Sequence, residues 1–210
     1  MIRSFAVFTA VTTILYSGLS WGDEPTTTNR EVKKAAAKVA VEVCSACHGP
    51  AGQSIGPQFP RLAGQQQLYL GAQLRALKNK TRADPEAHDF MWGIAGTLDD
   101  SLINGLAEYY AKQPPMRGTT KGPAALIEEG RELFKNGIPS KKIPACASCH
   151  GENAGGATIF PRLAGQQSAY LVRQLAVIQD SLRKSPIMHG IVQNLSENEM
   201  KAVAAYLESL

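Results

Sequence analysis

The chain has 210 residues, which is enough for one large domain or two small ones. It contains 22 basic and 18 acidic residues, which gives a formal net charge of +4. Nucleic-acid binding requires a clustered basic patch rather than such a mild excess, so no nucleic-acid partner is expected.

The N-terminus has the pattern of a secretory signal peptide. An arginine near the start is followed by an almost unbroken apolar run from Phe5 to Leu19. Ser20 and Gly22 are the small residues that a signal peptidase requires, so cleavage is expected after Gly22. The run is short for a membrane span, which needs about 20 apolar residues. Residues 1–22 are therefore predicted to be a signal peptide that exports a soluble mature chain, although a retained anchor stays open.

The pattern along the rest of the chain is helical. Residues 31–43 are rich in Ala and Lys, and the apolar residues within 124–135 fall on one helix face. Asp99 and Ser196 are expected to cap the last helix of each half, Ser196 in a capping box with Glu199. No stretch shows the sustained alternation of a half-buried strand. The predicted fold class is all-α.

All four cysteines belong to two Cys-x-x-Cys-His motifs, whose residues are Cys44, Cys47, His48, Cys146, Cys149 and His150. Two thiols three residues apart lie nearly one helical turn apart, so both can reach the vinyl groups on one edge of a porphyrin. The histidine that follows can then reach the iron. The two motifs therefore predict two covalently bound haem c groups.

Two other uses of paired cysteines fit the sequence poorly. A structural zinc site needs its second cysteine pair roughly 15 to 20 residues after the first. Here about a hundred residues intervene between Cys47 and Cys146. Thioredoxin-like redox chemistry needs an α/β context, which the helical pattern does not supply.

The chain contains a long internal repeat. The octet Phe-Pro-Arg-Leu-Ala-Gly-Gln-Gln occurs at residues 59–66 and again at 160–167. The offset between the copies is 102 residues at the cysteines, 101 at the octet and 97 at a later Met-x-Gly-Ile segment. The copies thus differ by small deletions in loops, where deletions are tolerated. The repeat indicates a duplicated domain of fewer than about 100 residues.

A segment rich in proline and glycine separates the copies. Its paired prolines predict an extended connection rather than a flexible tether. We therefore predict a signal peptide at 1–22, a first domain at 23–113, a linker at 114–123 and a second domain at 124–210.

The repeat also indicates which methionines are iron ligands. Met91 and Met188 occupy equivalent places, shortly before the final helix of each copy. Met200 lies on an apolar helical stripe, where core packing is expected, and Met116 lies in the linker without a counterpart. A methionine opposite histidine raises the reduction potential of a haem and suits an electron carrier. We therefore predict Met91 and Met188 as axial ligands.

Histidine is the competing ligand type. Only His88 and His189 lie outside the two motifs. His88 has no counterpart in the second copy, and His189 corresponds to Trp92 in the first. The repeat therefore favours methionine, and both histidines are expected in solvated loops.

The octet supplies further candidates near each haem. The carbonyls of Pro60 and Pro161 can accept the Nδ1 proton of the haem histidine, which sets the orientation and basicity of the ring. Arg61 and Arg162 can pair with haem propionates. A solvated surface charge is an equally open role for each arginine.

These segments resemble the cytochrome c4 family of periplasmic dihaem cytochromes, and the similarity covers residues 31–210. The resemblance implies two tandem class I cytochrome c domains, pseudo-two-fold related and packed face to face, each wrapped round a covalent haem. It also implies iron ligation by His48 with Met91 and by His150 with Met188, the Pro60 and Pro161 contacts, and electron delivery towards a terminal oxidase.

The function expected from this resemblance is electron transfer in a bacterial periplasm by a protein that is not an enzyme. A donor of the quinol–cytochrome c reductase type and an acceptor of the terminal oxidase type are expected, and peripheral membrane association stays open. Two alternatives remain. In the first, the chain is the haem subunit of a larger complex, such as a sulfide-oxidising flavocytochrome. In the second, it is a dihaem peroxidase. A peroxidase needs one iron with an open coordination site, and the two matched methionines argue against such a site.

Two local differences between the copies stand out. The second copy is short between Gln174 and Met188, which predicts a tighter loop before that methionine. Residues 137–145 are inserted before the second motif, and their Lys141-Lys142 pair faces either an anionic partner or solvent.

Overall fold

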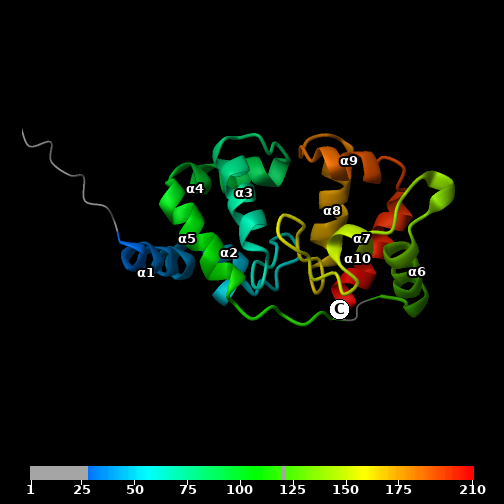
Figure 1. The fold of residues 1–210 in the computed structure, drawn as a ribbon, viewed down its shortest axis with the longest axis horizontal. Coiled ribbons are helices and arrows are strands. Elements are labelled where there is room, and N and C mark those ends of the chain that lie inside the picture. Colours follow the sequence, from blue (N-terminus) through cyan, green and yellow to red (C-terminus); the bar gives the residue numbers. More distant parts are fainter. Residues whose placement is uncertain (1–27, 120–121) are drawn as a thin grey trace, which may run out of the picture.

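The structure, a computed structural model, describes residues 28–119 and 122–210. The predicted signal peptide lies outside these residues. Figure 1 shows two groups of helices side by side, joined by an extended segment along one edge of both. Within the described ranges the chain forms helices and three isolated β-bridges, so the all-α prediction is confirmed. None of the helices in these ranges combines the length and apolar character needed to cross a bilayer.

In the first domain the helices surround the first Cys-x-x-Cys-His motif. They are α1 (Asn29–Val39), the π-helix η1 (Ala40–Cys44), α2 (Ser45–His48), the 3-10 helix η2 (Pro50–Gly52), α3 (Gln67–Lys78), the π-helix η3 (Ala87–Met91), α4 (Trp92–Gly96) and α5 (Asp100–Ala111). The helix predicted over 31–43 begins earlier, because Thr28 and Glu31 form a capping box. It continues through η1 into α2, which carries the motif.

The second domain repeats this arrangement. Its helices are α6 (Ala124–Asn136), the 3-10 helix η4 (Pro139–Lys141), α7 (Ala147–His150), α8 (Ser168–Gln179), α9 (Pro186–Val192) and α10 (Glu197–Ser209). Both predicted caps are confirmed. Asp99 accepts a hydrogen bond from the amide of Leu102 at 2.8 Å, and Ser196 forms its capping box with Glu199.

The first and last helices of each domain cross at a glycine. On α5, Gly105 faces α1 so closely that an added Cβ would lie 2.8 Å from the Cβ of Ala36. On α6, Gly130 faces α10, and an added Cβ would lie 1.9 Å from the carbonyl oxygen of Ala202. Such close approach buries the helix faces that form each core. The side chains of Ile103 and Phe134 at these crossings are fully buried.

The segment between the domains is held against both of them. Gln53 of the first domain donates a hydrogen bond to the carbonyl of Pro114 at 3.0 Å. The amides of Gly118 and Thr119 donate to the carbonyls of Leu210 and Glu208, at 3.3 and 2.9 Å. An extended segment anchored at both ends fits the prediction made from its paired prolines. It restricts how the two domains can sit relative to each other.

Candidate haem sites

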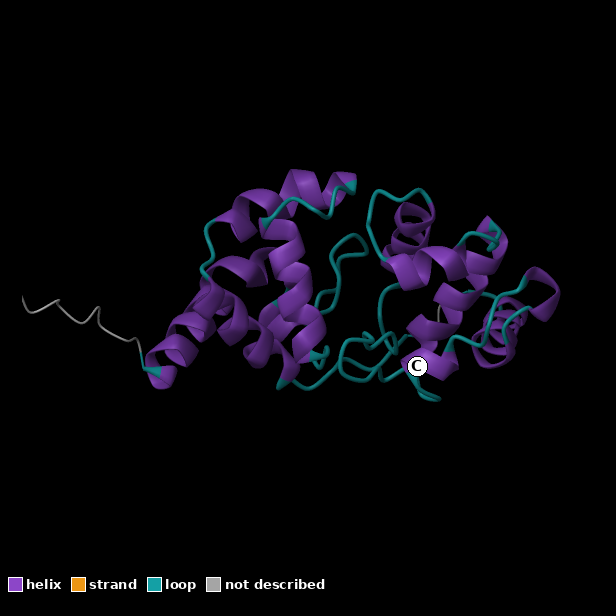
Figure 2. Ribbon diagram, turned by 45° about the horizontal axis from the view of Figure 1, so that its top comes forward, coloured by secondary structure: helices purple, strands orange, loops and turns teal. Residues whose placement is uncertain are grey.

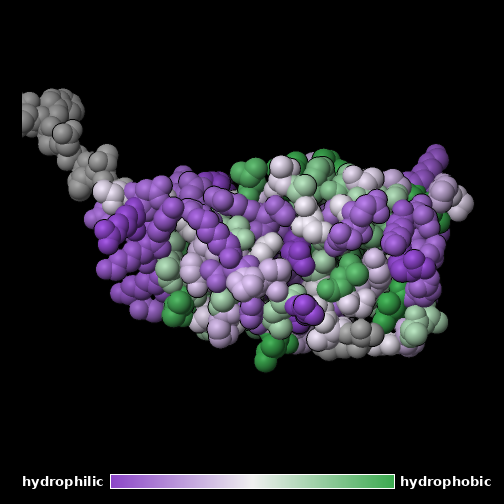
Figure 3. All heavy atoms as spheres, turned by 60° about the horizontal axis from the view of Figure 1, so that its bottom comes forward, coloured by the Kyte–Doolittle hydropathy of each residue, from purple (hydrophilic) through white to green (hydrophobic). Residues whose placement is uncertain are grey.

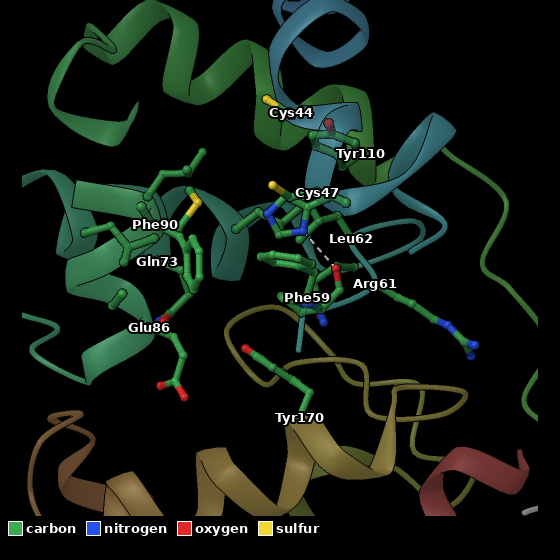
Figure 4. Close-up of a pocket in the computed structure, with 18 of the residues that line it drawn as sticks. Cys44, Cys47, Phe59, Arg61, Leu62, Gln73, Glu86, Phe90, Tyr110 and Tyr170 are labelled. Atoms are coloured by element: carbon green, nitrogen blue, oxygen red, sulfur yellow. Dashed lines mark hydrogen bonds between the residues drawn. The ribbon is translucent and has the colours of Figure 1, made fainter. Parts of the chain in front are cut away.

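Two cavities, each of about 310 Å³, lie one in each domain. Each brings one Cys-x-x-Cys-His motif to the methionine predicted from the same copy of the repeat. The first is lined by Cys44, Cys47, His48 and Met91, and the second by Cys146, Cys149, His150 and Met188. In Figure 4, Cys44 and Cys47 lie on one side of the first cavity, with Phe90 and Gln73 across from them.

Each motif histidine has a fixed orientation. His48 Nδ1 lies 2.9 Å from the carbonyl oxygen of Pro60, and His150 Nδ1 lies 3.0 Å from that of Pro161. A carbonyl only accepts, so Nδ1 carries the proton and Nε2 keeps its lone pair. Burial lowers the pKa of His48 and His150 by more than the hydrogen bond to the carbonyl raises it. Both rings are therefore neutral imidazoles that can bind a metal through Nε2.

The four motif cysteines are partly buried. Burial raises the pKa of the Cys44 thiol, and it raises the pKa of Cys146 to about 11. Reactive redox cysteines show the opposite shift, because the thiolate is the nucleophile. These pairs therefore do not have the electrostatic surroundings of a disulfide oxidoreductase.

The residue after each candidate methionine ligand anchors its segment. Trp92 donates its indole N–H to the carbonyl of Arg82 at 2.9 Å. His189 Nδ1 lies 2.9 Å from the carbonyl oxygen of Ile178. The first bond ties the Met91 segment to the chain that follows α3, and the second ties the Met188 segment to the last turn of α8. Trp92 and His189 occupy the same place in the repeat, but this shared role could not be predicted from the sequence. An indole and an imidazole have different sizes and shapes and share only a ring N–H that can donate.

The other sulfur and imidazole groups lie elsewhere. Met200 is 3 % exposed within the core of the second domain, and Met116 lies in the connecting segment. His88 is exposed and lies 2.6 Å from a carboxylate oxygen of Asp89. His189 is half-buried in α9, with its Nδ1 engaged as described above. The prediction of a loop is therefore wrong for both histidines, because His88 lies in η3, and the prediction of solvent exposure is confirmed only for His88.

The repeated octets meet at the domain interface, where Figure 2 shows the loops after the two motifs converging between the helices. Gln166 accepts a hydrogen bond from the amide of Arg61 at 2.9 Å and donates to its carbonyl at 3.0 Å. Gln65 makes the same two bonds with Arg162, at 2.7 and 3.0 Å. Equivalent residues thus exchange equivalent contacts, which is the pattern of a two-fold interface. The sequence marked this octet as repeated but did not show that it joins the domains.

The two octet arginines have different surroundings. Arg61 is 8 % exposed and donates to the carbonyl oxygens of Ser54, at 3.1 Å, and Gly165 of the other domain. Figure 4 shows its side chain leading away from the cavity. Arg61 is therefore not a solvated surface charge. Arg162 is half-buried, and its Nε has no hydrogen-bond partner. Arg162 therefore has a buried donor left for an anion.

We expect Gln166→Ala to loosen the domain interface. The change leaves the buried amide and carbonyl of Arg61 without partners, and each such group costs about 1–3 kcal/mol. Limited proteolysis should then cut the connecting segment faster than in the parent protein. Gln113→Ala is the matched control, because the Gln113 amide bonds only within its own domain. Equal cleavage rates for all three proteins would contradict this role.

The structure shows both local differences between the copies, the shorter segment before Met188 and the insertion at residues 137–145. In the first domain the segment before Met91 winds into the π-helix η3, whereas the shorter segment before Met188 enters α9 directly from Pro186. In the insertion, Lys141 binds Glu199 of its own domain at 2.6 Å. Lys141 is half-exposed, and Lys142 is exposed to solvent. The lysine pair is therefore not a free basic site.

The donor set in each cavity fits a c-type haem. The second thiol and a neutral imidazole with a free Nε2 lie on one short helix, α2 or α7, and the first thiol lies directly before that helix. A thioether on a separate segment lines the same cavity. Most of the lining is apolar, including Leu70, Leu74 and Leu98 in the first domain. A porphyrin held there would have its flat faces against hydrocarbon and its iron within reach of both ligand types.

Comparison with known proteins gives one consistent result. A family model described as Cytochrome c matches residues 33–113 and again 127–210. Cytochrome c-552 of Acidithiobacillus ferridurans is 42% identical over 169 residues, which cover 80% of this chain and 73% of that protein. A protein of Thiomonas intermedia named thiosulfate dehydrogenase electron acceptor is 35% identical over 179 residues, 82% of this chain and 81% of that one. The solved structure of cytochrome c4 from Acidithiobacillus ferrooxidans superposes with a TM-score of 0.76, at 42% identity, over 80% of this chain and 98% of that chain.

Proposed function

This chain belongs to the cytochrome c family as a dihaem protein of the cytochrome c4 type, and on that premise we propose that it shuttles single electrons along a bacterial periplasmic respiratory chain towards a terminal oxidase. It carries two covalently bound haem c groups and transfers electrons. We propose His48 with Met91 and His150 with Met188 as the axial ligands. We also propose the domain limits of 23–113 and 124–210; α5 ends at Ala111 and α6 begins at Ala124.

The observation that carries this proposal is that the two cavities share their walls. Tyr69, Gln73, Tyr170 and Gln174 line both of them. In Figure 4, Tyr170 projects from α8 of the second domain towards Phe59 of the first. A haem held in either cavity would therefore lie against residues of the other domain. Such proximity suits passage of an electron through the molecule.

The residues proposed as ligands explain why transfer is outer-sphere. When bound, the haem supplies a one-electron couple at its iron. The imidazole of α2 or α7 and the thioether of η3 or α9 would hold the haem iron together, which would leave no iron site for a substrate. We propose on this ground that the protein is a carrier and not an enzyme.

Exposure to carbon monoxide and to peroxide tests whether both haem irons lack an open coordination site. We expect the reduced native protein to keep its absorption spectrum under carbon monoxide, and the oxidised protein to show no turnover of peroxide. Loss of the parent spectrum at one equivalent of carbon monoxide per chain would show an open iron and support the dihaem peroxidase alternative. A Met91→Ala variant is the positive control, because it is designed to open one site.

The proposed donor and acceptor are membrane complexes of the quinol–cytochrome c reductase and terminal oxidase types. Docking is expected to be transient and steered by charge. Figure 3 shows a face with mostly hydrophilic residues over α1 and apolar residues in separate small patches, which suits brief contacts better than a permanent interface. Rates of oxidation by oxidase-containing membranes should fall as salt rises. Equal rates from low to high salt would contradict a steered encounter.

A second donor is favoured by one relative. The similar protein of Thiomonas intermedia is named as an electron acceptor of thiosulfate dehydrogenase. A sulfur-oxidising enzyme is therefore an alternative electron source, and permanent assembly with one, as in a flavocytochrome, is the stronger form of this alternative. Reduction of the purified protein by a thiosulfate dehydrogenase, but not by a quinol oxidoreductase, would favour it. We propose that this chain is exported to the periplasm, whichever of the two donors reduces it.

A further inference from the structure

The last residue of the long helix before each methionine segment makes an equivalent contact in the two domains. Lys78 ends α3 and Gln179 ends α8, and the two occupy the same place in the repeat. Lys78 Nζ donates a hydrogen bond to the carbonyl of Leu98 at 2.6 Å. Gln179 Nε2 donates to the carbonyl of Leu195, the counterpart of Leu98, at 3.0 Å. Two unlike side chains therefore bind the same carbonyl of the repeat.

That carbonyl lies at the end of the segment that carries the proposed iron ligand. Met91 directly precedes α4, which has five residues, and Met188 lies within α9, which has seven. Helices this short are not stable by themselves, so contacts with the rest of the domain decide where they lie. Leu98 and Leu195 follow these helices and directly precede the capping residues of α5 and α10. The side chain from the long helix therefore fixes the point where the methionine segment turns into the last helix.

Gln179 makes a more extensive contact than Lys78. Its amide also donates to the carbonyl of Val192, the last residue of α9, at 2.7 Å, and to that of Gln193 at 3.2 Å. The carbonyls at the end of a helix have no partners within the helix, so they need donors from elsewhere. One neutral amide thus serves three acceptors in the second domain, whereas one cation serves a single acceptor in the first.

Each methionine segment is therefore held at both of its ends. Trp92 and His189 hold the start, through contacts with carbonyls near the end of the preceding long helix. Lys78 and Gln179 hold the end. In the part of the chain that the structure describes, neither Lys78 nor Gln179 lines a haem cavity. Either residue would therefore act on a haem iron only through the methionine segment.

We propose that Lys78 and Gln179 are positioning residues that keep the thioethers of Met91 and Met188 on their irons. Release of a thioether becomes faster when its segment can move, and a segment bound at both ends moves less readily than one bound at its start alone. The proposal rests on the proposed electron-carrier function and its axial ligands. It adds to them the groups that keep the methionine position occupied.

The rate at which imidazole displaces methionine from the oxidised full-length dihaem protein tests this role. At saturating imidazole the rate is set by breaking of the iron–sulfur bond, and loss of the sulfur-to-iron charge-transfer band reports it. Met188→His leaves only the first-domain band, and Met91→His leaves only the second-domain band. In these two backgrounds, respectively, we expect Lys78→Leu and Gln179→Leu to raise the rate about tenfold, the factor that corresponds to one lost hydrogen bond.

The two copies supply each other's conservative variants. Lys78→Gln and Gln179→Lys exchange the two side chains, and each keeps a donor of the kind that reaches this carbonyl in the other copy. Both should stay close to the rate of their background protein. Lys135→Leu is the matched control, because Lys135 is exposed in the last turn of α6. Its rate should equal that of its background protein.

Urea denaturation of the same variants separates positioning from general stability. A leucine variant with a reduced free energy of unfolding but an unchanged imidazole rate would overturn the proposal. So would exchange variants that release methionine as fast as the leucine variants do. Lys78→Thr and Gln179→Thr, whose side chains are too short to reach the carbonyl, replace a leucine variant that fails to fold. Absence of both charge-transfer bands from the parent protein would refute the axial ligands and the proposal together, whereas intact bands with unchanged rates would refute the positioning role alone.

Discussion

Replacing Met91 or Met188 by histidine is expected to lower the reduction potential of that haem by on the order of 0.2 V. A thioether withdraws electron density and favours the ferrous state, whereas a second imidazole favours the ferric state. Axial ligands move haem potentials over a span of about 0.8 V, so a shift of this size is well within their reach. The change should appear as one displaced wave in a titration followed by absorption, with loss of that haem's sulfur-to-iron charge-transfer band.

Met200→Leu is the control for this experiment. Met200 is buried in the core of the second domain, so its replacement by a residue of similar volume should leave both waves and both bands in place. If Met91→His or Met188→His behaves like the control, the ligand assignment is wrong. His88 and His189 are then the groups to test, since each lies close in sequence to a candidate methionine.

Gly130→Ala is expected to lower the free energy of unfolding of the second domain by about 3 kcal/mol or more. The added Cβ would lie 1.9 Å from the carbonyl oxygen and 2.4 Å from the carbonyl carbon of Ala202. These are backbone atoms of α10, so no side-chain rotation relieves the clash and the two helices must separate. Overpacking of a core costs 1–3 kcal/mol and occasionally more, and a backbone clash belongs at the upper end. Urea denaturation followed at the haem absorption band measures the loss.

Gly155→Ala separates this effect from the general cost of replacing a glycine. Nothing lies within 4 Å of a Cβ added at Gly155, and its backbone does not require a positive φ. Its change in unfolding free energy should therefore stay under about 1 kcal/mol, with stabilisation the expected sign. Equal free energies of unfolding for Gly130→Ala and Gly155→Ala would contradict this prediction, because α6 and α10 could then move apart without loss of stability.

Local features of the fold followed directly from the sequence. The caps at Asp99 and Ser196 depend on residues within one turn, and the structure has both. The same kind of signal was present at Thr28 and Glu31, yet the predicted helix began at residue 31, after its own capping residue. That error was one of interpretation, since a capping box is visible in the sequence.

The roles of residues at the domain interface did not follow from the sequence. Arg61 and Arg162 are identical in the repeat, yet one guanidinium is buried against Ser54 and Gly165 while the other keeps an unpartnered Nε. Gln65 and Gln166 were likewise repeated residues without an assigned contact. Identical sequence cannot reveal which copy meets which surface, because that depends on how two folded domains pack.

The sequence by itself indicated the donor groups of each site, which are two thiols and a histidine at helical spacing and a methionine at an equivalent place in each copy. It also indicated the all-α duplicated fold. These features depend on covalent spacing and on helix period, which act over a few residues. Only the tertiary structure decided that the cavities share a wall and that each octet binds the other across the interface. Those properties come from contacts between residues about a hundred positions apart, and such contacts exist only once both domains are folded and docked.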